Sequence, residues 1–428
     1  MEEDRKLHFV IVGGSLGGLA TGLALKSLGH DTTMLERNPT PLLQDQGAGI
    51  VAGGDTLRFL KAYIRCNRPV AVSSHKRLYL DKDGTVIHTE EMEQNMTSQW
   101  DLTYNLMRAN YDYTKSDYCE TPSPLLSEGK AVHLHDRKVT ELMPEGNGIR
   151  VKWESSDGEK GSIAADYLIA ADGPGSTIRK ILEPEVQRIF TGYCALRGTV
   201  PENEVSQDAR EAFSERFTFF HASGIQILAY LIPGKNGTTE PGQRLVNFVY
   251  YTNFPEGSDE LEEVMTDKNG QRRHITMPPG MMRSAAWDKQ KQIAQDRLPP
   301  QFAEIVCKTK QPFVQAITDV ISPTNEYMDG KVILVGDALA GFRPHTVAST
   351  SQACFDAMVL ADYFRGKISH DEWKKQTLGF ARLVQKRGVD MGDRSQFKEL
   401  PLEEYIHDRN VASTPRDKEV FPDWATKV

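Results

Sequence analysis

A glycine-rich turn between an expected strand and an expected helix constrains the fold of this chain more than any other feature. Leu7–Val12 is a short apolar run, Gly13–Gly18 follows it as a turn, and Leu19–Leu28 has the apolar pattern of a helix. Thr32–Leu35 is a second apolar run, and Glu36 follows it directly. This order predicts the βαβ unit of a Rossmann-like dinucleotide-binding domain.

The chemistry of a dinucleotide explains the residue types at this turn. Pyrophosphate binding needs a turn whose backbone comes close, followed by a helix whose first N–H groups point at the phosphates. Gly13 and Gly18 suit such a turn, whereas Ser15 stands where the usual pattern has its middle glycine. The carboxylate of Glu36 is placed to accept both ribose hydroxyls, and Arg37 beside it to face the phosphates.

Two later motifs also join a strand to a loop. The run Asp166–Ala171 ends in Asp172-Gly173, and Val332–Val335 ends in Gly336-Asp337. A carboxylate at the end of a buried strand, such as that of Asp337, can accept hydrogen bonds from a ribityl chain. Each motif is weak evidence by itself, and their order along the chain is far more specific.

Together the three motifs resemble those of the flavoprotein aromatic hydroxylases, the relatives of p-hydroxybenzoate hydroxylase. The sequence is most similar to the branch of 2,6-dihydroxypyridine 3-monooxygenase. The likeness runs to about residue 365 and includes Arg197-Gly198, Val246-Asn247-Phe248 and Gly336–His345, whereas the tail carries none. It implies a Rossmann-like FAD-binding domain that is interrupted by a β-sheet substrate domain, an α/β (α+β) fold.

The resemblance also implies FAD as the cofactor and NAD(P)H as a co-substrate that binds transiently, because only one glycine-rich fingerprint is present. Arg108 matches an arginine that approaches the flavin phosphates, and Asp172 would serve both flavin and nicotinamide. At the two positions where the family has glycines after Pro344, this chain has Val347 and Ser349. The residues assigned to FAD are Gly13, Ser15, Leu16, Gly18, Glu36, Arg37, Arg108, Asp172 and Asp337.

Candidate catalytic residues follow the last motif and lie on two β-rich runs, Gln226–Ile232 and Leu245–Tyr251. His345 is the preferred one, because it adjoins the flavin loop and an ordinary histidine pKa of about 6.5 suits proton exchange near neutrality. The sequence leaves open which face of each run lines the pocket. The candidates are Arg343, Pro344, His345, Tyr230 and Asn247, with His221 and Tyr251 as further polar groups.

The expected reaction is hydroxylation of a hydroxylated aromatic or N-heteroaromatic ring by NAD(P)H and O2, through a hydroperoxide on flavin C4a. Such an electrophile requires an electron-rich, deprotonated substrate and a pocket that excludes water. Oxidative decarboxylation of a hydroxybenzoate-like acid and epoxidation use the same chemistry and stay open. A flavin dehydrogenase or isomerase that never activates oxygen is the alternative of another class.

A chain of 428 residues suits two domains and a tail. We expect an FAD-binding domain from residues 1–75, 105–190 and 325–365, and a β-rich substrate domain from 76–104 and 191–324. Residues 366–428 should form a helix and an irregular tail.

The resemblance implies a small aromatic substrate and O2 as partners, and composition argues against other kinds of partner. The formal net charge of −8 argues against nucleic acid, although local arginines can still favour an anion inside a pocket. The five cysteines form no CxxC pair, which argues against a metal site and fits a reducing compartment. We therefore expect a cytoplasmic protein without a membrane span, and leave a homodimer open.

Overall fold

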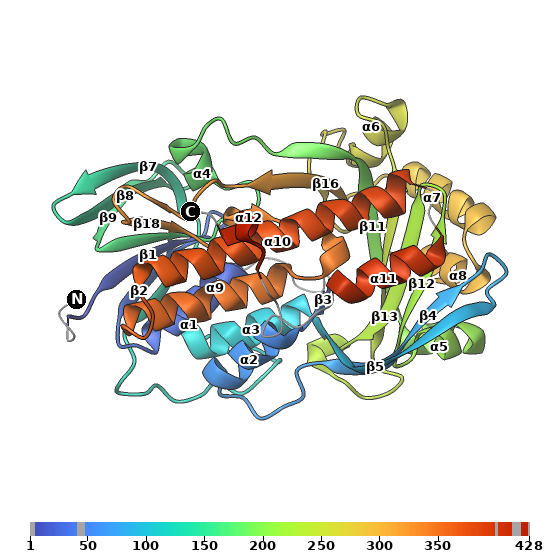
Figure 1. Ribbon diagram of the computed structural model, residues 1–428, viewed down its shortest axis with the longest axis horizontal. Coiled ribbons are helices and arrows are strands. Elements are labelled where there is room, and N and C mark those ends of the chain that lie inside the picture. Colours follow the sequence, from blue (N-terminus) through green and yellow to red (C-terminus); the bar gives the residue numbers. More distant parts are fainter. Residues whose placement is uncertain (1–4, 41–47, 399–400, 413–420, 427–428) are drawn as a thin grey trace.

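The computed structural model describes residues 5–40, 48–398, 401–412 and 421–426, and two large sheets dominate this part of the chain. The smaller has six strands in the order β17-β18-β10-β1-β2-β6 and fills the left half of Figure 1. Its strand pairs are parallel except for β17 with β18. The strands are β1 (His8–Val12), β2 (Asp31–Leu35), β6 (Ala131–Leu134), β10 (Tyr167–Ala170), β17 (Glu326–Tyr327) and β18 (Val332–Leu334).

The βαβ unit expected near the start of the chain is confirmed. β1 pairs in parallel with β2, and α1 (Leu16–Lys26) connects the two strands. Phe9, Val10 and Ile11 are fully buried, as expected for a parallel strand that is covered on both faces. Helix α9 (Ser349–Phe364) packs against α1, so the segment that follows Asp337 returns to the layer of the first helix.

The larger sheet fills the right half of Figure 1 and follows the order β15-β16-β11-β14-β13-β12-β4-β5-β3, with β19 beside β16. Its pairs are antiparallel except for β12 with β4. The strands are β3 (Gly49–Val51), β4 (Val72–Leu80), β5 (Val86–Gln99), β11 (Ile189–Pro201), β12 (Arg216–Ala222), β13 (Ile225–Ile232), β14 (Leu245–Asn253), β15 (Thr276–Met277), β16 (Phe313–Ile321) and β19 (Ala340–Gly341).

The two faces of this sheet belong to different cores, because alternate residues of a strand point in opposite directions. On β14, Phe248 and Tyr250 lie in a core that also contains residues of four helices, whereas Val249 and Tyr251 belong to a separate cluster on the other face. This packing decides which face of the strand meets the rest of the molecule. The helices are α5 (Gln207–Phe213), α6 (Asp259–Met265), α7 (Ser284–Arg297) and α8 (Pro300–Lys308).

The remaining elements fill the edges of both halves. Strands β7, β8 and β9 form a small antiparallel sheet of their own. The other elements are α2 (Gly54–Tyr63), α3 (Trp100–Tyr111), β7 (Lys138–Glu145), β8 (Gly148–Glu154), β9 (Lys160–Ala165), α4 (Thr177–Leu182), α10 (His370–Phe397), α11 (Leu402–Ala412) and α12 (Asp423–Thr426), with single 3-10 turns at Glu202–Glu204, Lys235–Gly237, Gly336–Ala338 and Pro344–Thr346.

Three segments differ from what the sequence indicated. The polar sequence of residues 256–320 indicates helix, but Phe313–Ile321 forms strand β16, and its burial largely alternates as in a half-covered strand. Beyond α10 the tail is not irregular throughout, because α11 packs Tyr405 against the inner face of the larger sheet. Strand β3 and the first residues of β4 join the larger sheet from the range assigned to the FAD-binding domain. The domain boundaries themselves stay a prediction.

Among the described residues, no helix has both the length and the apolar character needed to cross a bilayer.

Candidate active site

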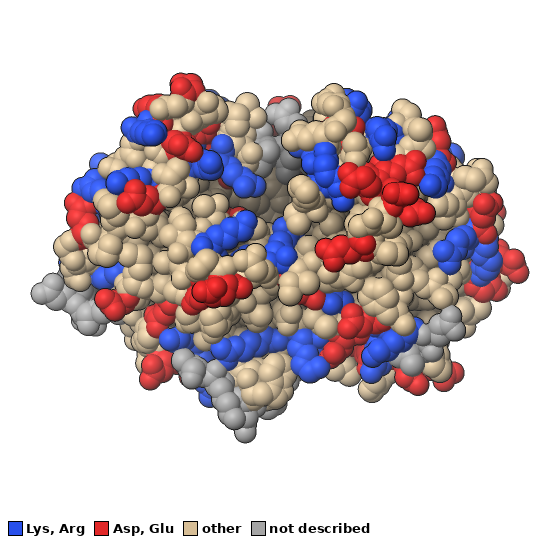
Figure 2. Space-filling model, turned by 90° about the horizontal axis from the view of Figure 1, so that it is seen from above, with Lys and Arg blue, Asp and Glu red and all other residues tan. Residues whose placement is uncertain are grey.

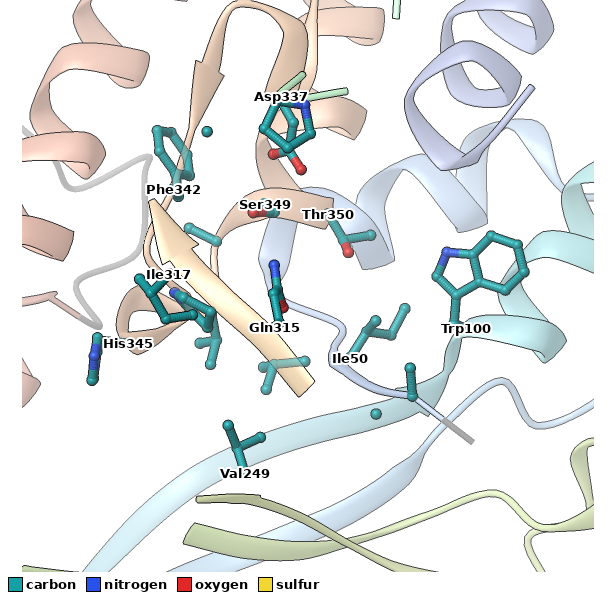
Figure 3. A pocket seen from close by; sticks show the side chains of 18 of the residues that line it. Ile50, Trp100, Val249, Gln315, Ile317, Asp337, Phe342, His345, Ser349 and Thr350 are labelled. Carbon is teal, nitrogen blue, oxygen red and sulfur yellow. The ribbon is translucent and has the colours of Figure 1, made fainter. Parts of the chain in front are cut away.

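A cavity of about 490 Å³ lies between the two sheets and joins the glycine turn to the inner face of the larger sheet. In Figure 3, Asp337 lies at one end of the cavity and Val249 at the other, with Gln315 between them. His345 and Trp100 lie on opposite sides of this axis. One continuous cavity therefore has a motif-rich end and a sheet-walled end.

At the motif-rich end, two glycines are required by the backbone itself. Gly13 has a φ of +104°, and a Cβ there would lie 2.4 Å from the carbonyl oxygen of Ala171. A Cβ at Gly18 would lie 2.0 Å from the carbonyl oxygen of Gly13. Neither position accepts a side chain, so the turn comes close to strand β10 and α1 begins directly behind it.

The groups that face this end fit the cofactor that the motifs imply. Ser15 is the N-cap of α1 but makes no side-chain capping bond, and Leu16 and Gly17 line the cavity. The first N–H groups of the helix thus face a site suited to phosphate. Asp337 also lines the cavity, and its buried Oδ1 has no hydrogen-bond partner among the described residues. Burial raises the pKa of Asp337 to about 6, so near neutrality it is mostly an acceptor that a ribityl hydroxyl would satisfy.

Glu36 is buried directly after strand β2 and does not line the cavity, so its role as the ribose ligand stays a prediction. Its Oε2 accepts a hydrogen bond from the N–H of Gly14 (2.8 Å), and its Oε1 accepts one from the N–H of Asn38 (2.9 Å). A carboxylate oxygen has two lone pairs, so Oε2 keeps capacity for a hydroxyl donor. Arg37, the next residue, is exposed.

Two other expected cofactor residues are engaged within the protein. The guanidinium of Arg108 is buried, pairs with Asp112 at 2.8 Å and donates to the hydroxyl of Tyr104 at 2.7 Å. The Oδ2 of Asp172 accepts the N–H of Thr177 (2.7 Å) at the start of α4, and Asp172 does not line the cavity. Its Oδ1 is buried without a hydrogen-bond partner among the described residues, and the expected double role of Asp172 toward flavin and nicotinamide stays a prediction.

His345 and Pro344 line the sheet-walled end, as do Tyr230 and Tyr251. The His345 ring stacks on Tyr251 with ring centroids 4.3 Å apart, and its Nε2 lies 3.0 Å from the hydroxyl of Tyr193. Burial lowers the pKa of His345 well below its ordinary value, and the nearby Arg343 and Arg409 lower it further. This corrects the expectation of an ordinary histidine, because His345 stays neutral throughout the physiological range.

Arg343 and Asn247 hold the site together without lining it. Arg343 is buried, and its guanidinium pairs with Asp319 of β16 (2.5 Å) and Asp393 of α10 (2.7 Å). The Oδ1 of Asn247 accepts the N–H of Gly49 (3.1 Å) and so joins β14 to β3. Neither residue lines the cavity. The charge of Arg343 is thus balanced by two carboxylates inside the fold, and the expectation that Arg343 holds substrate stays a prediction.

Val347 occupies one of the positions where the resembling family has glycine, and the backbone shows why glycine suits it. Its φ is +52° and its ψ is +25°, which is the left-handed region. This conformation is strained for a β-branched residue. The side chain lines the cavity and packs partly against the cluster that contains Tyr251.

The sequence reading missed the cations of the cavity. Among the described residues, Arg188, Arg197 and Arg409 line it, while Asp337 is the carboxylate that does so. Positive and negative side chains are interspersed over the face seen in Figure 2, so the excess of cations belongs to the cavity and not to that surface. The segment Arg197-Gly198 is similar to the resembling family, so the sequence could have pointed to Arg197. Arg409 lies in α11, in the tail that shows no such similarity.

Known proteins are similar to this chain over most of its length. A family model described as FAD binding domain-like matches residues 190–319. The 2,6-dihydroxypyridine 3-monooxygenase of Paenarthrobacter nicotinovorans is 28% identical over 88% of this chain and 89% of its own. The 6-methylsalicylate 1-monooxygenase of Aspergillus terreus is 23% identical over 86% and 77%.

A solved structure gives the same result. That of 2,6-dihydroxypyridine-3-hydroxylase from Arthrobacter nicotinovorans superposes with a TM-score of 0.79 at 25% identity, and covers 93% of this chain and 94% of that one. In sequence and in fold, the chain is similar to FAD-dependent aromatic hydroxylases over most of its length. FAD is accordingly its cofactor, and the glycine turn, the start of α1 and Asp337 are the groups that fit it.

Proposed function

We propose that the protein uses NAD(P)H and O2 to hydroxylate an electron-rich, hydroxylated aromatic or N-heteroaromatic ring that it binds as an anion. The observation that carries the proposal is the single cavity, which runs from a site suited to FAD to a wall lined by Arg197, Arg409, Tyr230 and Tyr251. The names of the relatives, which act on a dihydroxypyridine and a methylsalicylate, support the substrate class.

When bound, FAD supplies the chemistry that takes electrons from NAD(P)H and activates oxygen. The protein's own part is to position the ring, to exclude water and to control the proton of its hydroxyl group. The wall of buried Tyr230, Tyr251 and Val249 suits the exclusion of water. The guanidinium of Arg197 suits an ionised oxygen, because charge-assisted hydrogen bonds favour the deprotonated form of a phenol.

His345 and Tyr193 form a pair that is able to relay a proton. A neutral imidazole carries one N–H and one acceptor nitrogen. Nδ1 of His345 is buried without a partner among the described residues, while Nε2 faces the Tyr193 hydroxyl. In one tautomer Nδ1 accepts the proton of a substrate hydroxyl, and in the other it donates a hydrogen bond to the resulting oxyanion. Because the pKa of His345 is lowered, the imidazole is neutral when the substrate binds, so one ring nitrogen is available as an acceptor.

The test is a panel of hydroxypyridines, hydroxybenzoates and urate, offered to the FAD-loaded protein with NADH or NADPH under ¹⁸O2. We expect oxygen uptake and a product that has gained one labelled oxygen atom. Reduced cofactor consumed without oxygen uptake would identify a dehydrogenase or isomerase instead. Loss of CO2 from a hydroxybenzoate would select oxidative decarboxylation, and labelling of a side-chain alkene would select epoxidation.

We further propose that the protein is cytoplasmic, because the five cysteines, all within the described residues, are free. A homodimer also stays a proposal, which light scattering of the purified protein tests directly.

A further inference from the structure

Helix α11, close to the end of the chain, brings a guanidinium to the substrate end of the cavity. Arg409 is 4% exposed and lines the cavity together with Tyr230, Tyr251 and His345. Its Nη1 donates to the backbone carbonyl oxygen of His345. Its guanidinium carbon lies 5.6 Å from the centre of the Phe219 ring. Arg409 therefore touches both the loop that follows Asp337 and the inner face of the larger sheet.

Three contacts attach this helix to the body of the protein. The hydroxyl of Tyr405 accepts a hydrogen bond from the Nε2 of Gln226 on β13. Asp408 pairs with Arg394 of α10. The Oδ1 of Asn410 accepts a hydrogen bond from Arg77 of β4 (2.8 Å). Figure 1 shows α11 lying along the larger sheet, beside the strands that wall the cavity. The helix is docked along its length, so Arg409 is presented in a defined position.

Arg197 on β11 lines the same cavity, and the two cations act on the same hydroxyls: both lower the pKa of Tyr230 and of Tyr251, which burial raises. Two guanidiniums near one pair of hydroxyls create a local positive field in a chain whose net charge is −8. A ligand with an ionised oxygen would be stabilised there.

We propose that Arg409 is a substrate-binding residue and that, with Arg197, it recognises an ionised oxygen on an aromatic ring. The C-terminal helix then selects anionic rings over neutral ones of the same shape. This rests on the proposed function only for the identity of the ring, because binding to the FAD-loaded protein does not require turnover. The anion has two chemical sources, a ring carboxylate or a deprotonated ring hydroxyl, and the probes distinguish them.

The experiment measures dissociation constants by titration calorimetry and by the change in the flavin absorption spectrum. The probes are 2-hydroxybenzoate, 2,6-dihydroxypyridine and the neutral 2-hydroxybenzamide. In R409Q we expect binding of the anionic probes to weaken about 10–100-fold, the usual range for loss of a charge-assisted hydrogen bond. Binding of the amide should change less than about 3-fold by the same reasoning, R409K should lie between, and FAD content should be unchanged.

D408N is the matched control in the same helix, because it removes the ion pair with Arg394 but keeps Arg409. It should bind all three probes nearly as the unchanged protein does. Equal losses for the anions and the amide in R409Q, or the same loss in D408N, would assign Arg409 a purely structural role and overturn the proposal. An unchanged protein that binds neither anion more tightly than the amide would overturn it as well.

The outcome of this binding test does not depend on whether the proposed function is correct, so failure of one proposal can be distinguished from failure of the other. Selective loss of anion binding in R409Q, in a protein that oxygenates nothing in the panel, would support the anion site and contradict the monooxygenase assignment. Preference for the hydroxybenzoate would identify a carboxylate ligand, and preference for the dihydroxypyridine an ionised hydroxyl.

Discussion

At the cofactor end of the cavity, the groups that face the ligand are backbone N–H groups at the start of α1 and the carboxylate of Asp337 after a strand, all within short motifs. At the substrate end they are side chains such as Arg197, Tyr230, Tyr251, His345 and Arg409, which come from four strands or helices and a loop. The first end depends on a locally determined backbone. The second exists only when distant segments pack, so it has far more freedom to change its ligand.

The largest effect tests the chemistry of the substrate end. In His345→Ala, FAD should be retained, but product formation should fall about 10²–10⁴-fold, the usual contribution of a proton-transferring side chain. Reducing equivalents should be diverted to hydrogen peroxide, measured by its yield per NAD(P)H consumed. Since the pKa of His345 is lowered well below its ordinary value, the pH profile of the unchanged protein should show no histidine limb between about pH 6 and 7.

If His345→Ala hydroxylated nearly as fast as the unsubstituted protein, with the same yield of product per NAD(P)H consumed, His345 would not belong to the proton path. The search would then move to Tyr230 and Tyr251, which line the same wall. Loss of flavin from His345→Ala would show instead that the two ends of the cavity are not independent.

The cofactor end is tested by Glu36→Ala. Loss of hydrogen bonds between a charged acceptor and the ribose should weaken FAD binding by about 2–5 kcal/mol. Part of this loss will come from the turn, because Oε2 also accepts the N–H of Gly14. Fluorescence titration of the apoprotein with FAD measures the affinity, and excess FAD should restore turnover. Full flavin content with unchanged affinity would show that Glu36 is not the ribose ligand.

Asp356→Asn tests a buried charge behind the cofactor end. The Oδ2 of Asp356 accepts the N–H of Gly336 (2.8 Å), and burial raises the pKa of Asp356 to about 8. The folded state therefore holds a proton that the unfolded state releases above about pH 4, and stability falls as pH rises from there to about 8. Asparagine keeps an acceptor oxygen and has no proton to lose.

The expected result is a flatter pH dependence. Urea unfolding should find Asp356→Asn more stable than the unchanged protein at pH 8, by on the order of 2–4 kcal/mol, with a much smaller difference at pH 5. Parallel stability curves for the two proteins would contradict the raised pKa. Asp362→Asn in the same helix removes a partly exposed carboxylate that pairs with Lys367 and leaves Asp356 in place, so it serves as the control that keeps the slope.

The smallest effect concerns Val347, whose φ is +52°. Val347→Gly relieves about 1–2 kcal/mol of left-handed strain but loses the packing of a half-buried side chain and adds freedom to the unfolded chain, at about 0.5–1 kcal/mol. The net change in unfolding free energy should stay within about 1 kcal/mol. Val347→Ala also loses packing, but it keeps a Cβ in the left-handed region, so the strain is not relieved. Val347→Ala should therefore be the less stable of the two variants. The reverse order in thermal melts would contradict the strain.

The sequence by itself determined the cofactor end of this protein. Gly13 and Gly18 sit where a Cβ would collide with backbone, and Glu36 and Asp337 follow strands, so each is fixed by contacts within a few residues or one strand pairing. Such local requirements leave a pattern in the sequence. The sequence likewise predicted the βαβ unit and the β-rich character of the second half.

Only the tertiary structure decided the substrate end. Packing places the face of β14 that carries Tyr251 toward the cavity, and it encloses Arg343 between two carboxylates. Burial near two arginines lowers the pKa of His345. Packing also brings Arg409 from the tail to a cavity whose lining begins at Ser15, near the other end of the chain. Burial and long-range charge depend on which segments meet, and no spacing along the chain encodes that meeting.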